Sequence, residues 1–343
     1  MNLSVNRQIV LAERPTGRVT AECFALRESA PQSLQQGDVL IRNIYLSCDP
    51  YMRGQLGGNG YKALFALDAP IPARVVGQVH DSRNAKFAVG EFVWGFLGWE
   101  DYTLVAAGEG LRKVDPSHGP ISYAISLLGM NGLTAYVGIV DIGKPQAGQT
   151  AFVSAASGAV GQIAGQLARI HGCRVVGSAG SDAKVTHLCE SLGFDAAFNY
   201  KHEASLEQAL ARTCPDGIDI YFDNVGGPTL DAVLGQLNES ARIAVCGQIS
   251  QYDNTSGGYG LKNFPAILGT RSTITGFSVR SHMDQFDTVI AKLGEWLRAG
   301  ELRYAQDIVA GLEATPAAFI GMMAGENFGK RLVQVGPDPT LAT

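Results

Sequence analysis

The middle of the chain, from Thr150 to about Gly300, alternates short apolar segments with helical ones. Six segments have the length and composition of buried strands, and they begin at Thr150, Cys173, Phe194, Asp219, Ala241 and Ser272. A helical segment follows five of the six. Regular alternation of strand and helix is typical of a parallel sheet with helices on both faces. The sequence therefore predicts the α/β class, with a doubly wound, six-stranded parallel sheet.

A glycine-rich turn joins the first of these strands to the first helix. The turn, residues 155–161, reads AASGAVG, with Ala156 at the place of the first glycine in the G-x-G-x-x-G fingerprint. Glycines in such a turn let the backbone approach a pyrophosphate, whose charge is met by N–H groups and by the helix dipole. Outside this context the pattern would indicate only a tight turn. Between a strand and a helix it predicts a dinucleotide site.

The end of the second predicted strand indicates which dinucleotide binds. Residues 176–180 read VGSAG and contain no acid. NAD-specific sites place a carboxylate here, about 20 residues past the glycines, where it bonds the ribose hydroxyls. Without that carboxylate a 2′-phosphate is not repelled, and Lys184 is a cationic partner for it. Asp182 lies nearby and either opposes the phosphate or serves the helix N-terminus. We expect NADP(H).

The first 125 residues have another pattern. Strand-like segments separated by turn residues predict a small, irregular β domain, and they cover residues 7–12, 38–47, 73–80, 91–96 and 101–106. Near the C-terminus a helix at about 316–324 precedes the apolar segment KRLVQV, which begins at Lys330. By sequence order this strand has no partner in the parallel sheet, so we expect it to return to the first domain. The predicted domains are 1–127 with 312–343, and 128–311.

Composition and charge exclude several classes of function. The 343 residues are 46% hydrophobic and 17% charged, which is typical of a chain that folds. Twenty-seven Lys and Arg face 32 Asp and Glu, and no basic run occurs, which disfavours nucleic-acid and membrane partners. The six cysteines form no C-x-x-C pair, and the N-terminus has no apolar stretch of signal-peptide length. We expect reduced thiols and a cytoplasmic location.

The sequence offers no set of ligands for a metal ion. Cys48 follows a predicted strand, but no close Cys cluster or His-Glu pair accompanies it, and residues 72–77 read PARVVG. We therefore expect no metal site, and we interpret Cys48 as a small buried side chain. The six histidines fall in unrelated contexts, so no Ser-His-Asp or Cys-His arrangement is visible either.

Several motifs in a fixed order resemble a known family. They are DPYMRG (49–54), LGMNGLTAY (128–136), the glycine turn, FNYK (198–201), DNVGG (223–227), CGQIS (246–250) with Tyr252, and ENFGK (326–330). Together they resemble the zinc-independent medium-chain dehydrogenase/reductases, in the branch of the NADP-dependent leukotriene B4 dehydrogenase / prostaglandin reductases and bacterial curcumin reductases. The resemblance covers nearly the whole chain.

This resemblance implies a GroES-like catalytic domain, a Rossmann domain that binds NADPH, a cleft between them, and a homodimer. The activity that the resemblance implies is reduction of the C=C bond of α,β-unsaturated ketones and aldehydes. The implied cofactor contacts are Gly158, Ala159, Val160, Gly161, Lys184, Tyr200, Asn224, Cys246, Gly247, Ile249, Ser250, Tyr252, Phe277, Ser278, Val279 and Asn327. The chain departs from its relatives around 54–68 and 254–263, so the substrate is the least transferable property.

Reduction of a C=C bond next to a carbonyl group requires side chains near the substrate, and two tyrosines are candidates. Hydride addition at the β-carbon builds negative charge on the carbonyl oxygen, and a proton then reaches the α-carbon. We expect the phenols of Tyr51 and Tyr252 near the substrate, as hydrogen-bond donors or as the proton source. Two alternatives stay open on the sequence: an NADPH quinone oxidoreductase of the same superfamily, and an NADPH-binding protein without catalysis.

Overall fold

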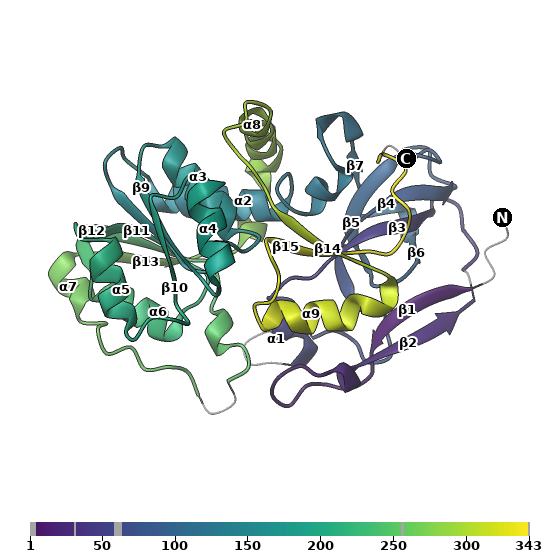
Figure 1. The fold of residues 1–343 in the computed structure, drawn as a ribbon. Coiled ribbons are helices and arrows are strands. Elements are labelled where there is room, and N and C mark those ends of the chain that lie inside the picture. Colours follow the sequence, from purple (N-terminus) through teal and green to yellow (C-terminus); the bar gives the residue numbers. More distant parts are fainter. Residues whose placement is uncertain (1–4, 31, 58–63, 255–256, 342–343) are drawn as a thin grey trace. The chain divides into compact units, whose positions relative to one another are not determined.

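The computed structural model describes residues 5–30, 32–57, 64–254 and 257–341 (Figure 1). Its internal contacts divide the chain into two compact units, Met1–Ile125 with Gln306–Thr343 and Ser126–Ala305. The boundaries predicted from the sequence follow residues 127 and 311. Residues 306–310 group with the first unit because they form strand β14 (Gln306–Ala310), which pairs with β15 (Lys330–Gln334) of that unit.

The first unit is built on a mixed sheet. The sheet has seven strands in the order β14-β15-β3-β4-β5-β7, with β6 paired to β3. The remaining bounds are β3 (Val39–Ser47), β4 (Pro72–Ser82), β5 (Phe92–Gly98), β6 (Tyr102–Val105) and β7 (Arg112–Val114). A separate antiparallel pair, β1 (Asn6–Leu11) and β2 (Phe24–Ser29), and two α-helices, α1 (Met52–Gly57) and α9 (Thr315–Met323), complete it. Short 3-10 turns are η1 (Ala21–Cys23), η2 (Ala106–Gly108), η3 (Pro116–His118), η4 (Ile121–Ile125) and η8 (Leu312–Ala314).

The C-terminal strand returns to the first unit, as the sequence predicted. Strand β15 pairs antiparallel with β3, with Leu332 opposite Ser47. It also pairs parallel with β14, whose Gln306 stands opposite Lys330. Because of this register, the end of β3 and the beginning of β15 lie side by side.

The second unit contains the predicted parallel sheet. Its six strands run in the order β10-β9-β8-β11-β12-β13, and every neighbouring pair is parallel. The strands are β8 (Thr150–Val153), β9 (Arg174–Ala179), β10 (Ala196–Asn199), β11 (Ile218–Asp223), β12 (Leu237–Val245) and β13 (Thr273–Gly276). The chain order reverses between β8 and β11, and dinucleotides bind beyond the carboxyl ends of strands at such a switch point.

Helices cover this sheet at positions that local sequence signals define. They are α2 (Met130–Tyr136), α3 (Gly161–Ile170), α4 (Asp182–Glu190), α5 (Leu206–Thr213), α6 (Gly227–Leu234), α7 (Ala266–Thr270) and α8 (Phe286–Arg298), with turns η5 (Val137–Gly143), η6 (Ile249–Gln251) and η7 (Val279–Gln285). Ser181 caps α4, because its Oγ accepts the Lys184 N–H at 3.4 Å. Past the ends of α3 and α4, Gly172 and Gly193 adopt φ values of +82° and +73°.

Aromatic side chains fill the centre of each unit. In the first, Trp99 is fully buried, with ring centroids 5.9 Å from those of Phe24 and Phe319. In the second, Phe152 stacks on Phe198 at 6.0 Å and on Tyr221 at 5.4 Å.

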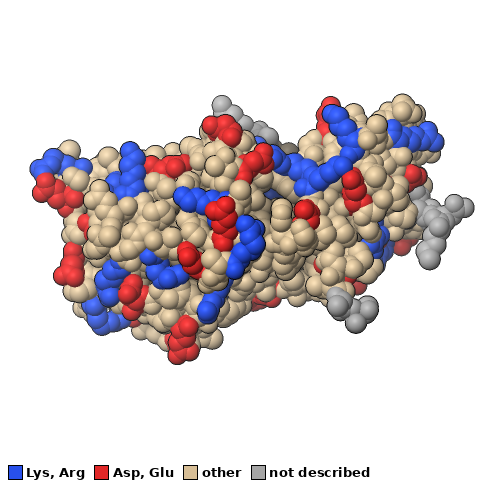
Figure 2. All heavy atoms as spheres, turned by 90° about the horizontal axis from the view of Figure 1, so that it is seen from above, with Lys and Arg blue, Asp and Glu red and all other residues tan. Residues whose placement is uncertain are grey.

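Within the described residues, every helix is too short or too polar to cross a membrane. On the face drawn in Figure 2, Lys and Arg side chains are interspersed with Asp and Glu.

Candidate functional site

The glycine turn lies between β8 and α3, as predicted. Ala155 adopts the left-handed conformation, with φ of +47°. A Cβ at Gly161 would stand 2.4 Å from the Ala155 carbonyl oxygen and 2.9 Å from the Ala156 Cα, so this position admits no side chain. At Gly158 a Cβ would have the Ala155 oxygen as its nearest heavy atom, at 3.1 Å. The turn is therefore tightly packed at Gly161, whereas residues 158–160 are partly exposed.

A buried polar network joins the loops after β8 and β11. The Asn224 side-chain amide donates to the Ser154 carbonyl oxygen at 2.7 Å, and the Asn224 N–H donates to Ser154 Oγ at 3.0 Å. Asp223 is fully buried, and its Oδ1 accepts the Tyr221 hydroxyl at 2.6 Å and the N–H groups of Val225 and Gly226 at 2.9 and 2.8 Å. Burial raises the pKa of the Asp223 carboxyl, although these donors favour its charged form. The network fixes Asn224 at the switch point of the sheet.

The predicted loop from Cys246 to Tyr252 lies against this network. The N–H groups of Cys246 and Gly247 donate to the Asp223 carbonyl oxygen at 2.8 and 3.0 Å, and Ser250 Oγ donates to the Val225 oxygen at 2.7 Å. Burial raises the pKa of the Cys246 thiol to about 12, so it stays neutral. The Tyr252 hydroxyl oxygen accepts the Gln248 N–H at 3.3 Å.

A second group of predicted residues gathers where β9 and β10 end. Lys184 lies in the first turn of α4 and is 8% exposed, whereas Tyr200 is exposed just past β10. A Cβ at Gly180 would stand 3.1 Å from the Tyr200 hydroxyl and 3.4 Å from Cε of Lys201. Gly180 and Lys201 were not among the predicted site residues, although the position of Lys201 next to Tyr200 in the FNYK motif was a signal. The ends of β9 and β10 bring Gly180, Tyr200 and Lys201 together, and β9 itself carries no carboxylate.

The structure also shows what Asp182 does. Its Oδ1 accepts the Asn199 side-chain amide at 2.8 Å and lies 3.3 Å from Nδ1 of His202. The carboxylate is therefore engaged by residues of the turn after β10. Asp182 also opens α4, which fits the second role considered for it on the sequence, an acid in the first turn of the helix.

Two predicted site residues, Tyr51 and Asn327, belong to the first unit, and the others belong to the second. Phe277, Ser278 and Val279 directly follow β13. Asn327 precedes β15 and donates its side-chain amide to the Gly329 carbonyl oxygen at 2.6 Å. Asp307 Oδ2 accepts the neighbouring Phe328 N–H at 2.8 Å and lies 3.0 Å from the Arg331 guanidinium, which secures this turn.

Tyr51 follows β3 in a segment anchored by a buried lysine. Lys330 is 1% exposed, and its Nζ donates to Asp49 Oδ1 at 2.6 Å, to Ser47 Oγ at 2.7 Å and to the Cys48 carbonyl oxygen at 2.8 Å. Burial alone would raise the pKa of Asp49, but the charges of Lys330 and Arg74 hold it below its ordinary value. Cys48 itself is a core side chain, and burial raises its pKa to about 12.

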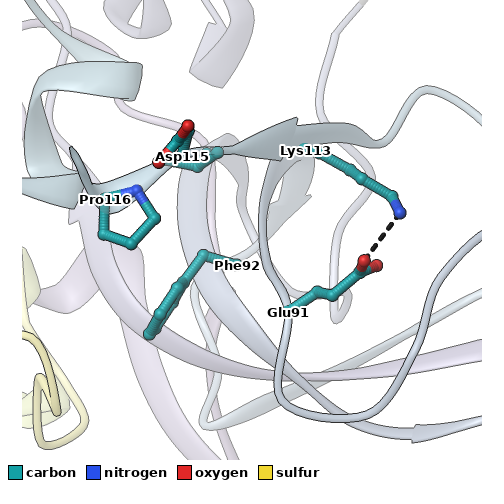
Figure 3. A pocket seen from close by; sticks show the side chains of 6 residues that line it. Glu91, Phe92, Lys113, Asp115 and Pro116 are labelled. Atoms are coloured by element: carbon teal, nitrogen blue, oxygen red, sulfur yellow. Dashed lines mark hydrogen bonds and ion pairs between the residues drawn. The ribbon is translucent and has the colours of Figure 1, made fainter. Parts of the chain in front are cut away.

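Two further observations concern sites of other kinds. In the part of the chain that the structure describes, no group of three or more His, Cys, Asp or Glu could hold a metal ion. A cavity of about 380 Å³ lies between β5 and β7 (Figure 3). It contains none of the predicted site residues, and its lysine, Lys113, is already paired with Glu91 at 2.7 Å. We therefore do not assign a ligand to this cavity.

Comparison with known proteins extends over the whole chain. Residues 7–114 match the family described as the N-terminal domain of oxidoreductase, and residues 159–295 match the family described as zinc-binding dehydrogenase. The chain is 42% identical to the 2-alkenal reductase (NADP(+)-dependent) of Nicotiana tabacum, with 96% of this chain and 97% of that one aligned. It is 39% identical to the NADPH-dependent curcumin reductase of Escherichia coli (strain K12), with 97% and 98% aligned.

A solved structure extends the likeness to three dimensions. The crystal structure of CurA from Vibrio vulnificus in complex with NADPH matches with a TM-score of 0.91 and 43% identity. The match covers 97% of this chain and all of that chain. The arrangement of both the mixed sheet and the parallel sheet is therefore shared with a protein that binds NADPH.

Proposed function

Because the chain belongs to the zinc-independent medium-chain dehydrogenase/reductases, in the branch of the alkenal, prostaglandin and curcumin reductases, we propose that it reduces the C=C bond of α,β-unsaturated ketones and aldehydes with NADPH. The observation that carries this proposal is the end-to-end similarity to a 2-alkenal reductase and to an NADPH-bound structure. The alignment covers 96% of the chain and so includes both units, which supports the proposal for the chain as a whole.

The residues of the second unit fit NADPH. The partly exposed backbone at Gly158, just before α3, and the tight turn at Gly161 suit a pyrophosphate. Tyr200 and Lys201 lie next to Gly180 just past β9, and Lys184 lies in the first turn of α4. The absence of a carboxylate on β9 suits a 2′-phosphate at this end of the strand. Asn224, fastened to Ser154, and the 246–252 loop lie at the switch point. We assign the nicotinamide end to these residues, to Phe277–Val279 and to Asn327.

Two tyrosine phenols are assigned roles in the proposed reaction, as hydrogen-bond or proton donors to the substrate. Bound NADPH supplies a hydride for the β-carbon. Tyr252, whose hydroxyl oxygen already accepts the Gln248 N–H, is assigned as donor to the carbonyl oxygen as negative charge builds there. Tyr51 is assigned as a second donor or as the source of the proton for the α-carbon. Both groups are neutral, so they stabilise the developing charge without repelling the incoming cofactor.

Substitution of the two tyrosines tests these assignments. Removing one oxyanion donor in other enzymes costs about 10²- to 10³-fold in kcat, so Tyr252→Phe should lower kcat far more than it changes NADPH affinity. Tyr51→Phe should also lower kcat, and the double variant should be non-additive if both phenols serve one oxygen. Unchanged kcat in both single variants would contradict the assignments while leaving the reductase activity itself in place.

A substrate panel separates the proposal from its two alternatives. NADPH oxidation should be fast with an enone and slow with a quinone of similar size. Faster turnover of the quinone would favour the alternative function of an NADPH quinone oxidoreductase. Tight NADPH binding without oxidation by any member of an enone panel would favour a protein that only binds the cofactor.

We propose that the second unit pairs with a second copy of the chain to form a homodimer. Strand β13 is an edge of the parallel sheet, and all its residues are exposed. Nearby, Leu268 is 84% exposed and Phe264 is 56% exposed. An exposed edge with apolar neighbours is a favourable surface for symmetric pairing. Light scattering should give a mass near twice 36.3 kDa, and a monomer at all concentrations would contradict the proposal.

We also assign a catalytic role to the GroES-like unit and cofactor binding to the parallel-sheet unit. We expect small enones or enals as substrates and a cytoplasmic location for the protein. All six cysteines are free thiols in the structure, which suits a reducing compartment. Fractionation of cells that express a tagged chain would test the location, with recovery outside the cytosol as the contradicting result.

A further inference from the structure

Two motifs that lie far apart in the sequence meet through the Asp49–Lys330 ion pair. Asp49 begins the DPYMRG motif and Lys330 ends the ENFGK motif, yet their charged atoms are 2.6 Å apart. All three polar contacts of the Lys330 ammonium go to consecutive residues, Ser47, Cys48 and Asp49. Such geometry fixes the backbone that immediately precedes Tyr51.

A third charge, Arg74 of β4, stands beside this pair. The Arg74 Nη1 lies 3.5 Å from Asp49 Oδ2, and its side chain is 15% exposed. Lys330 already neutralises Asp49 at the shorter distance of 2.6 Å and is itself buried. Two cations thus face one carboxylate, so the ion pair of Asp49 and Lys330 leaves the charge of Arg74 in excess.

The guanidinium of Arg74 is directed at Tyr51. Its Cζ lies 5.4 Å from the centre of the Tyr51 ring, within the range of a cation–π contact. The same guanidinium therefore contacts the Asp49 carboxylate through Nη1 and lies over the Tyr51 ring. Lys330, Asp49 and Arg74 thus form a chain of contacts that ends at the proposed substrate tyrosine.

We propose that Arg74 is a positioning residue for Tyr51, which it orients through a cation–π contact while Asp49, itself anchored by Lys330, holds the guanidinium in place. The inference rests on the proposed function, because it assigns Arg74 a role only through the phenol of Tyr51. It adds to that function a residue of β4 that the family motifs above do not include.

The test is a double-mutant cycle measured with one enone substrate. Arg74→Met, which keeps the apolar stem and removes the guanidinium, is made in the wild-type chain and in Tyr51→Phe. Arg42→Met is the matched control, since Arg42 on β3 directs its guanidinium to Gln78 of β4, at 3.0 Å, rather than to Asp49. Arg74→Lys keeps the charge next to Asp49, so it provides a folded variant if Arg74→Met does not fold.

If the proposal holds, Arg74→Met lowers kcat about tenfold in the wild-type chain and by less than about twofold in Tyr51→Phe, with little change in KM. Arg74→Lys should recover part of the loss, and Arg42→Met should match the wild type. An equal loss in both backgrounds would overturn the proposal. So would an unchanged kcat in Tyr51→Phe, and in that case enone turnover by the wild-type chain shows that the proposed function itself stands.

Discussion

The side-chain amide of Asn224 donates to the main-chain oxygen of Ser154 at 2.7 Å, which fastens the loop after β11 to the loop after β8. These two loops border the point where the strand order reverses. Asn224 also donates its N–H to Ser154 Oγ. These two hydrogen bonds hold the two loops of the proposed NADPH site together. The remaining acceptor of the Asn224 amide is available for the cofactor.

Asn224→Ala should weaken NADPH binding about tenfold, because it removes one fixed polar contact and the bond that holds the loop. Fluorescence titration of bound NADPH measures the effect. Asn238→Ala is the matched control, since Asn238 bonds Asp219 at 3.1 Å on the same sheet but at the opposite ends of its strands. Equal losses in the two variants would show that Asn224 acts only on stability.

Lys184→Ala and Lys201→Ala should each weaken NADPH binding by about 1 to 3 kcal/mol and leave NADH binding almost unchanged. Each substitution removes a cation beside the proposed 2′-phosphate position. Lys86→Ala removes the same charge from the first unit, which holds none of the residues assigned to the 2′-phosphate, and should affect neither cofactor. Equal affinity of the wild-type chain for NADPH and NADH would refute the assignment.

Lys330→Met should lower the free energy of unfolding by about 3 to 5 kcal/mol near neutral pH, because it leaves the Asp49 charge buried without its main partner. The double variant Asp49→Asn with Lys330→Met removes both charges and should recover much of the loss. Urea unfolding measures both effects. A single variant as stable as the wild type would contradict this account of the pair.

The same pair predicts a pH dependence with a definite sign. The pKa of Asp49 in the folded chain lies below its ordinary value of 3.8, so the carboxylate favours folding above that pH. The stabilisation is lost as the pH falls below 3.8 through the lower pKa of the folded state. The difference in stability between the wild type and the double variant should therefore shrink in this acidic range only.

Exhaustive chelation should leave turnover intact. The sequence lacks the close Cys and His cluster of a catalytic zinc site, and the described residues contain no group of three metal-ligating side chains. Activity and metal content before and after dialysis against a chelator measure this. Stoichiometric zinc whose removal abolishes activity would overturn the prediction.

The parallel sheet could be predicted because each buried strand and amphipathic helix carries a local signature. Strand β14 was missed for the opposite reason, since its five residues are half-buried or exposed and its apolar run is only the three residues 308–310. The π-helical turn η5 was also missed. Its Gly138 accommodates Phe222, because a Cβ there would stand 2.2 Å from that ring. Such a fit depends on a strand that lies far along the chain, beyond three other strands.

The glycine turn, Lys184 and Tyr200 could be identified as site candidates because motif and strand position coincide. The Asp49–Lys330 pair could not, since 281 residues separate its members and neither residue type is expected to be fully buried. Lys201 and Gly180 needed the pairing of β9 with β10, which places Asn199 opposite Ala179 and so brings the residues that follow each strand together. The contacts between motifs that lie far apart in the chain could not be predicted from the sequence.

The most direct test of the central claim is the position of deuterium in the product when NADPH labelled at C4 of the nicotinamide is used with an enone. We predict a saturated ketone that keeps its carbonyl and carries the deuterium at the former β-carbon, as read by NMR and mass spectrometry. An allylic alcohol with the double bond intact and deuterium on the carbinol carbon would contradict the assignment as a C=C reductase.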